Sequence, residues 1–296
     1  MSEIVGVNDY HYKQEPEWAQ VEIKGKVSDM ATDSSNHVYL AVRTTQAEDD
    51  NTGVIMVLDS TGHFVHNIGA DKLKTPHHIW ISPDDEIYLT DCEDHVVRVY
   101  DRTGNLTQII GTPGQPGMPE APFNMPTCAV QSSSSGDIFV SDGYRQNRIH
   151  RFNNDGELKL SWGKGDRNQY DWELFGLGTP STSKGEFNTP HSLTLSADGR
   201  VYVMDRSNHR VQVFNEEGTY INEWALPHPN KAATDNEGML HIATWEGIAI
   251  FDLEGKTLGK WGMDSQWKGG HGICVDSNAN IYTTGVEMSI HRFSRV

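Results

Sequence analysis

Hydrophobic and polar positions alternate along most of this chain, in short segments separated by turns rich in Gly, Asp and Asn. One set of segments reads HVYLAV, EIYLTD, DIFVSD, RVYVMD, MLHIAT and NIYTTG, and each is followed by a second alternating segment such as VVRVYD or RVQVFN. Alternation with a period of two over a short segment is the pattern of antiparallel strands. No part of the chain shows helical periodicity, so the pattern predicts an all-β protein.

These strands belong to a unit that recurs six times, and each unit opens with a short segment before the turn. The units start at residues 27, 76, 126, 190, 229 and 270, and the first five also carry a fourth alternating strand such as ELKLSWG or TLGKWGM. Four strands per unit at a period of about 40–50 residues predict a six-bladed β-propeller of four-stranded blades. The longest interval contains Gly163 to Phe187, a polar, Gly-rich stretch that we expect to be an inserted loop.

The sixth unit ends at Val296, before any fourth strand. The alternating segment Trp18–Ile23 precedes the first unit, and pairing it onto the last blade would close the ring and remove an exposed sheet edge. We therefore expect an N-terminal strand to complete the last blade. The predicted organisation is an N-terminal arm over residues 1–16 and a single propeller domain over residues 17–296.

Composition limits the classes of binding partner and the cellular compartment that we expect for this chain. A net charge of −17 over 296 residues argues against nucleic acid or an anionic membrane surface as a partner. The three cysteines, Cys92, Cys128 and Cys274, are widely spaced and form no CxxC pair, which favours buried thiols in a reducing compartment. Neither a signal peptide nor a membrane-spanning apolar run is evident. We expect a cytoplasmic monomer or weak homo-oligomer that acts on a small molecule.

Three histidines occupy the same slot of the repeat in alternate units. The second position of the opening segments reads Ser28, His77, Thr127, His191, Asn230 and His271. In a ring of six blades, alternate members lie about 120° apart, so three imidazoles would meet at the axis. Three neutral imidazoles suit zinc or another divalent first-row metal and leave a position open for water or substrate. The competing interpretation is that these histidines only hydrogen-bond across the channel. By strand alternation, His78 should point away from the axis.

The start of the innermost strand and the turn after the second strand lie on the same face of a propeller. This face should bring Arg43, Tyr144 and Arg206 close to the three histidines. A phenol beside a metal can act as a general base, and an arginine offers a planar fork to a carboxylate. Asp91, Asp142 and Asp205 recur in one slot and are expected to stabilise turns.

Two sets of motifs resemble known families. Ser207-Asn208-His209-Arg210-Val211 and Gln146-Asn147-Arg148-Ile149 resemble the NHL repeat, which implies a six-bladed propeller but no particular activity. Within that class the chain resembles the peptidyl-α-hydroxyglycine α-amidating lyases, through Pro76-His77, Ser141-Asp142-Gly143-Tyr144, Asn147-Arg148-Ile149, Pro190-His191-Ser192-Leu193 and Asp205-Arg206. The resemblance implies zinc held by His77, His191 and His271, a catalytic Tyr144 and functional arginines at Arg43 and Arg206. It also implies cleavage of an N-acyl hemiaminal to an amide and an aldehyde.

The chain departs from that family at two positions. Gly272 stands where the family has an acidic residue that contributes to a structural calcium site, and Gly269 stands where it has a methionine. These departures argue against calcium at the axis. The sequence shows no copper monooxygenase domain or secretion signal, which favours a small hydroxylated metabolite as substrate.

Two other functions remain open at this point. One is a metal-dependent hydrolase, such as a lactonase, at the same site. The other is a non-catalytic NHL interaction module. Trp172, Phe175 and Trp245 near the mouth could serve either view, as a lid over a small pocket or as anchors for a partner.

Overall fold

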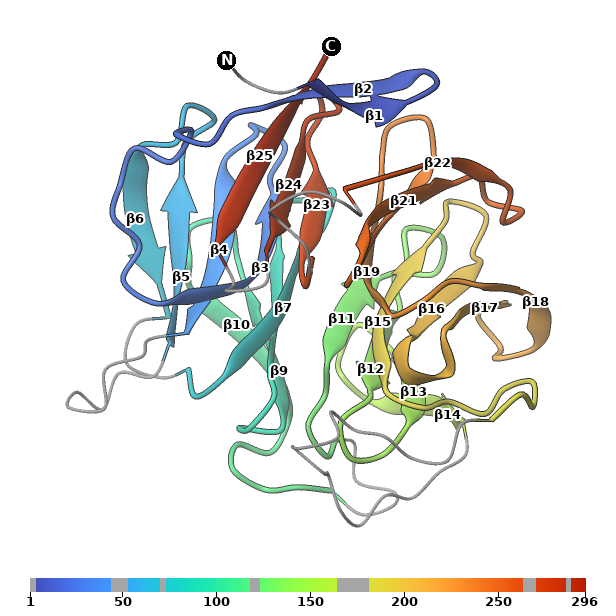
Figure 1. Ribbon diagram of the computed structural model, residues 1–296. Coiled ribbons are helices and arrows are strands. Elements are labelled where there is room, and N and C mark those ends of the chain that lie inside the picture. Colours follow the sequence, from blue (N-terminus) through green and yellow to red (C-terminus); the bar gives the residue numbers. More distant parts are fainter. Residues whose placement is uncertain are drawn as a thin grey trace.

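A computed structural model describes residues 4–43, 53–69, 73–117, 123–163, 181–262, 270–285 and 289–296. Its strands form six antiparallel sheets that follow one another around a central axis (Figure 1). The prediction of an all-β, six-bladed propeller is therefore confirmed. In this part of the chain the only helix is a three-residue 3₁₀ turn, η1 (Arg206–Asn208), and no helix has the length and apolar character to cross a bilayer.

Each of the first five blades takes four consecutive strands. Blade 1 contains β3 (Lys26–Thr32), β4 (Val38–Arg43), β5 (Gly53–Leu58) and β6 (Phe64–Ile68), and blade 2 contains β7 (Pro76–Ile81), β8 (Ile87–Asp91), β9 (Val96–Tyr100) and β10 (Leu106–Gly111). Blade 3 contains β11 (Cys128–Gln131), β12 (Ile138–Asp142), β13 (Arg148–Phe152) and β14 (Leu158–Trp162). Blade 4 contains β15 (Pro190–Leu195), β16 (Val201–Asp205), β17 (Arg210–Phe214) and β18 (Tyr220–Ala225), and blade 5 contains β19 (Pro229–Thr234), β20 (Leu240–Thr244), β21 (Gly247–Phe251) and β22 (Thr257–Trp261).

Blade 6 joins the two ends of the chain. It contains β23 (Ile273–Val275), β24 (Ile281–Thr284) and β25 (Ile290–Arg295), to which β2 (Tyr10–Gln14) and then β1 (Ile4–Val7) are added as outer strands. An N-terminal strand thus closes the last blade, as the sequence predicts. The closing strand is β2, which lies within the segment expected to be an arm.

The segment expected to close the ring, Trp18–Ile23, is not a strand, so that detail of the prediction is wrong. Its residues run along the edge of blade 1, where the Trp18 indole donates to Ser60 O and Gln20 N donates to Gly62 O. The closing position goes to β2 because Tyr12 is buried there and stacks on Trp261 in the core between blades 5 and 6. Alternation alone does not distinguish two neighbouring segments that both alternate.

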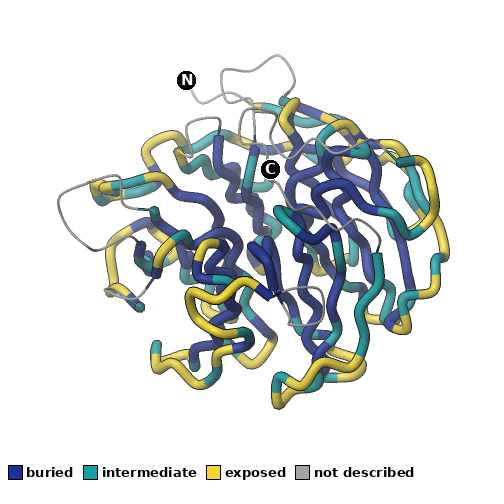
Figure 2. The backbone as a smooth tube through the Cα atoms, turned by 90° about the horizontal axis from the view of Figure 1, so that it is seen from below, coloured by how far each residue is buried: buried dark blue, intermediate teal, exposed yellow. Residues whose placement is uncertain are grey.

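Hydrophobic side chains fill the spaces between the blades. The buried apolar residues form six clusters, and each combines residues from two adjacent blades. Figure 2 shows buried backbone concentrated on the inner strands and exposed backbone at the turns. Because every blade is packed on both faces, the inner strands form a rigid wall around the axis. All three cysteines are free and buried, as the sequence predicts.

The innermost strands share an irregularity near their first residues. A shift in pairing register lies between Val27 and Asp29 in β3, between Pro76 and Ile79 in β7, between Pro190 and Ser192 in β15 and between Pro229 and Lys231 in β19. Each shift is a β-bulge, in which one extra residue on the inner strand faces its partner. The repeated bulge falls on the slot that holds Ser28, His77, His191 and Asn230, so it shapes the lining of the channel.

Candidate metal centre and catalytic site

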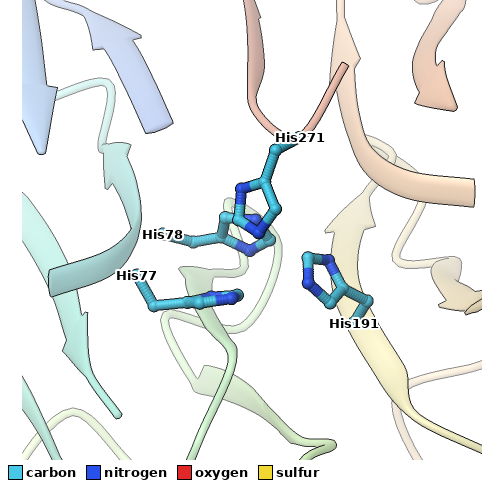
Figure 3. Close-up of side chains that lie close together, drawn as sticks. All are labelled: His77, His78, His191 and His271. Atoms are coloured by element: carbon cyan, nitrogen blue, oxygen red, sulfur yellow. The ribbon is translucent and has the colours of Figure 1, made fainter. Parts of the chain in front are cut away.

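His77, His191 and His271 meet at the axis from alternate blades. Their ring centroids are 4.9 Å apart for His77 and His191, 4.9 Å for His77 and His271, and 4.8 Å for His191 and His271 (Figure 3). The three rings therefore form a nearly equilateral triangle, as expected from their common slot in the repeat.

A backbone carbonyl of the next blade orients each of these rings. The Nδ1 atoms lie close to carbonyl oxygens of the intervening slot residues: His77 to Thr127 O at 2.7 Å, His191 to Asn230 O at 2.9 Å and His271 to Ser28 O at 2.7 Å. A carbonyl oxygen can only accept, so each Nδ1 must carry the proton. The lone pair of each neutral imidazole is then on Nε2, the nitrogen that a metal would bind.

The side chains between the histidines complete this ring of hydrogen bonds. Each donates to the carbonyl oxygen just before the next histidine: Ser28 Oγ to Pro76 O at 2.8 Å, Thr127 Oγ1 to Pro190 O at 2.9 Å and Asn230 Nδ2 to Gly270 O at 2.7 Å. This pattern requires a side-chain donor in the intervening blades, which explains Ser, Thr and Asn at those positions. The six slot residues therefore form one circuit that fixes the orientation of all three imidazoles.

His78 also lies in this cluster, contrary to the expectation that it points away from the axis. Its ring centroid is 4.3 Å from that of His77 and 4.9 Å from that of His191 (Figure 3). The cause is the bulge in β7, where Pro76 pairs with Asp91 but Ile79 pairs with Leu89. The extra residue breaks the alternation, so two successive side chains face the channel.

Burial keeps all four imidazoles neutral. Desolvation is the largest cause of the lowered pKa of each ring, and it brings the pKa of His271 to about 3. Positive charge adds to this effect, since Arg43 lowers the pKa of His77 and His271 and Arg206 lowers the pKa of His191. Neutral imidazoles are the form that binds metal ions.

Tyr144 covers the triangle from the mouth of the channel. Its hydroxyl oxygen lies 2.7 Å from His77 Nε2 and 3.0 Å from His191 Nε2. Gly143 makes this approach possible, because a Cβ at that position would lie 2.2 Å from Pro190 O, next to His191. The turn of blade 3 can thus press against the start of β15.

The donors and acceptors at this point do not balance. His77 Nε2 and His191 Nε2 are both acceptors, and the phenol between them has one proton to give. Within the described part of the chain, nitrogen lone pairs therefore converge on one another with too few protons to share. A cation would satisfy them, so the donor set fits a metal ion. In the part of the chain that the structure describes, His77, His78, His191 and His271 form a group whose ligand atoms all lie within 4.8 Å of one another.

Two arginines flank Tyr144 and the histidines. The Arg206 guanidinium lies over the Tyr144 ring, with its central carbon 5.8 Å from the ring centroid. Backbone bonds from Arg206 N to Thr189 O and from Ser207 N to Asn188 O hold η1 in place. Arg43 ends β4, and its Nε donates to Pro76 O at 2.8 Å, directly before His77. The structure thus brings together all six residues that the sequence analysis selected.

A buried ion pair lies one layer deeper in the channel. The Lys231 ammonium donates to the Asp29 carboxylate, to Ile79 O at 2.9 Å and to Met30 O at 3.2 Å. The sequence analysis missed this pair, although both charges occupy the slot after the Ser28 and Asn230 positions. Strand alternation predicts that this third slot points away from the axis, and the bulges in β3 and β19 reverse that expectation.

Gly272 is explained by the same ion pair. A Cβ at Gly272 would lie 2.2 Å from Asp29 Oδ1, so the position cannot carry an acidic side chain while Asp29 occupies the axis. The acidic side chain at the axis is Asp29 of blade 1 and does not come from blade 6. The Lys231 ammonium donates to its carboxylate and to two nearby carbonyl oxygens. Gly269 lies outside the described residues.

The remaining predicted residues have simpler positions. Asp91, Asp142 and Asp205 each accept a hydrogen bond of 2.7 Å from the backbone of the preceding connection, at Thr75 N, Asn124 N and Asn188 N respectively. They hold those connections in place, as expected of turn-stabilising residues. Trp245 is 40% exposed and stacks on His228. Trp172, Phe175 and most of the expected loop Gly163 to Phe187 lie outside the described residues.

The chain is similar to several known proteins. The model of the NHL repeat matches residues 187–214. The chain is 28% identical over 237 residues to peptidyl-glycine alpha-amidating monooxygenase B of Xenopus laevis, covering 73% of this chain and 26% of that protein. It is 28% identical over 231 residues to a probable peptidyl-alpha-hydroxyglycine alpha-amidating lyase of Caenorhabditis elegans, covering 71% of this chain and 62% of that protein.

A solved structure supports the fold. The gluconolactonase of Xanthomonas campestris superposes with a TM-score of 0.68 at 13% identity, covering 98% of this chain and 91% of that one. This likeness concerns the fold alone. The chain spans about a quarter of the length of the Xenopus monooxygenase and less than two thirds of the Caenorhabditis protein. The chain is therefore a six-bladed β-propeller that carries an NHL repeat and resembles the peptidyl-α-hydroxyglycine α-amidating lyases.

Proposed function

We propose that this chain is a metal-dependent lyase that cleaves the carbon–nitrogen bond of an N-acyl hemiaminal, R-CO-NH-CH(OH)-R′. The products are an amide and an aldehyde. One observation carries the proposal: imidazole lone pairs converge beneath the Tyr144 hydroxyl with too few protons to share, and two arginines flank them. Similarity to proteins named as amidating lyases supports this reaction class.

His77, His191 and His271 would hold zinc or another divalent first-row metal through Nε2. When bound, such an ion supplies Lewis acidity to the hydroxyl oxygen of the substrate and favours loss of its proton. The hydrogen-bond circuit through Ser28 and the other slot residues would hold the imidazoles in the required orientation. We do not propose a structural calcium, since the Lys231 ammonium takes up the oxygen atoms at the axis.

In this proposal Tyr144 acts as the general base in its phenolate form, which the positive charge of a bound metal ion favours. It takes the hydroxyl proton while the electron pair of that O–H bond forms the second carbon–oxygen bond of the aldehyde. The electron pair of the carbon–nitrogen bond leaves with the amide nitrogen, which takes up the proton. No water is consumed, so the reaction is an elimination. Arg206 and Arg43 would hold a carboxylate or carbonyl oxygen of the substrate.

The substrate is proposed to be a small hydroxylated metabolite. The site lies inside a channel of buried imidazoles, and Tyr144 covers it closely. A compact hemiaminal with a carboxylate, such as an α-hydroxyglycine derivative, would match the two arginines in charge.

Metal analysis followed by substrate screening tests the proposal. The purified chain should carry about one divalent ion, the number that one closed imidazole site accepts. His191→Ala should lose that ion, whereas His241→Gln, a buried control in β20, should keep it. Failure to bind any divalent ion added in excess would disprove the metal-dependent lyase.

Isotope labelling then distinguishes the lyase reaction from hydrolysis. Hemiaminal, ureidoglycolate and lactone substrates are incubated in water enriched in oxygen-18. A lyase yields an aldehyde and an amide, and the cleavage of the C–N bond incorporates no oxygen from the solvent. The products are analysed at early times, before the aldehyde oxygen exchanges with water. A hydrolase yields an acid that contains solvent oxygen, and that result would favour the lactonase alternative.

A further inference from the structure

His78 differs from the other three imidazoles in its hydrogen bonding. Both of its ring nitrogens are buried and have no hydrogen-bond partner among the described residues. Its backbone is paired, since His78 N and O both contact Thr90 Oγ1, so only the ring is left without partners. A buried polar group without a hydrogen-bond partner destabilises the fold, because it has lost its hydration and gained no replacement. Such a group needs a physical reason to be retained.

Among the described residues, no group donates a hydrogen bond to the His78 ring. Lys231 lies on the deeper side, but an ammonium has three protons, and these go to Asp29, Met30 O and Ile79 O. The other imidazoles donate their Nδ1 protons to backbone carbonyls. The Nε2 atoms of these three rings are therefore left with lone pairs, and a metal ion that binds them could also take up one nitrogen of His78.

The position of His78 completes the cluster from the side opposite to Tyr144. β7 runs from the mouth into the channel, and His78 is one residue deeper than His77. Its ring centroid lies 5.3 Å from that of His271, and one nitrogen of each of the four rings can be chosen so that all lie within 4.8 Å of one another. Three imidazoles thus come from three blades around the axis, and the fourth comes from beneath them.

We propose that His78 is a fourth protein ligand of the metal, on the inner side of the histidine triangle. The inference rests on the metal site of the proposed function. Four imidazoles would use all positions of a tetrahedral ion, so the site should favour an ion that accepts five or six ligands, or zinc in an expanded coordination. The face left for substrate is then the mouth, where Tyr144 and both arginines lie.

Counting the imidazoles on the ion tests this directly. The full chain, labelled with nitrogen-15 at histidine, is loaded with cadmium-113 alone, and the nitrogens coupled to cadmium are counted by NMR. Four coupled imidazole nitrogens are expected in the wild-type chain and three in His78→Gln. The affinity for cadmium should fall at least about 10-fold in His78→Gln, since even an outer-shell partner contributes 10–100-fold. His241→Gln should leave both readouts unchanged.

The possible failures are distinct. Three coupled nitrogens in the wild-type chain would overturn the role of His78 and leave the proposed lyase site intact. If cadmium, zinc and cobalt all fail to bind, the proposed function and this inference fall together. The wild-type count decides the matter even if His78→Gln does not fold.

Discussion

The Lys231 ammonium reaches across the channel from β19 to the Asp29 carboxylate on β3, one layer below the histidines. Burial raises the pKa of Asp29 to about 6, and the charge of Lys231 opposes that rise. A cavity of about 380 Å³ opens on the far side of Lys231, and none of the four histidines lines it. The ion pair therefore separates the histidine site from the opposite face of the propeller.

Removing one partner of this ion pair should destabilise the fold strongly. Lys231→Met leaves the Asp29 carboxylate buried without its cation, and breaking a buried pair in this way costs about 3–5 kcal/mol. The double variant Asp29→Asn with Lys231→Met removes both charges and should recover most of the loss. Denaturant unfolding of the metal-free chain measures both values. A loss below about 1 kcal/mol in Lys231→Met would show that the pair contributes little.

Tyr144→Phe should separate metal binding from turnover. The substitution keeps the ring that packs beside Arg206 and removes only the hydroxyl near His77 and His191. We expect the metal content to stay at the wild-type level while kcat falls by about 10²–10⁴-fold, the usual contribution of a general base. Metal analysis and steady-state kinetics on the same preparation provide the test. Full activity in Tyr144→Phe would exclude the general-base role.

The effect of Arg206→Lys on KM should depend on whether the substrate carries a free carboxylate. Lysine keeps the charge but loses the planar fork, and a hydrogen bond to a charged group contributes about 1.5–3 kcal/mol. For a hemiaminal with a free carboxylate we expect KM to rise by roughly 10–100-fold. For the matching carboxamide the change should be small. Equal effects on both substrates would mean that Arg206 supports Tyr144 and does not bind a carboxylate.

The sequence was sufficient to predict the fold and the residues that meet in the candidate site. A slot that recurs in six units places His77, His191 and His271 on one axis without any knowledge of the backbone details. His78 could not be placed because the β-bulge in β7 breaks the alternation on which such a prediction depends. A bulge is a matter of pairing register between two strands, and hydrophobic pattern does not record it.

The closing strand and the axial ion pair also depend on contacts that the sequence pattern does not record. Both Trp18–Ile23 and Tyr10–Gln14 alternate, and the choice between them depends on whether Tyr12 finds a buried site against Trp261. Asp29 and Lys231 are far apart in sequence, and only the ring brings them together. Contacts between blades that are not neighbours in sequence are set by closure of the ring, which a local pattern does not describe.

Acid should unfold the metal-free chain at an unusually high pH. The four channel histidines have folded-state pKa values below 6.5, mainly because burial disfavours the charged ring. A group with a lowered folded-state pKa stabilises the fold above its unfolded pKa, and this contribution is lost as the pH falls. Each such histidine changes the free energy of unfolding by about 1.4 kcal/mol per pH unit.

Asp29 works in the opposite direction in part of this range. Its folded-state pKa of about 6 exceeds the ordinary value of 3.8, so below pH 6 the folded chain takes up a proton that the unfolded chain does not. In this range the unfolded chain therefore binds about three more protons than the folded chain. The free energy of unfolding should fall by about 4 kcal/mol per pH unit between about pH 6 and pH 5. Zinc should shift the acid midpoint to lower pH, because the ion binds only the folded site. Circular dichroism across pH 4–8, with and without zinc, measures both effects, and a stability that stays flat below pH 6.5 in the metal-free chain would show that the imidazoles are not held neutral by burial.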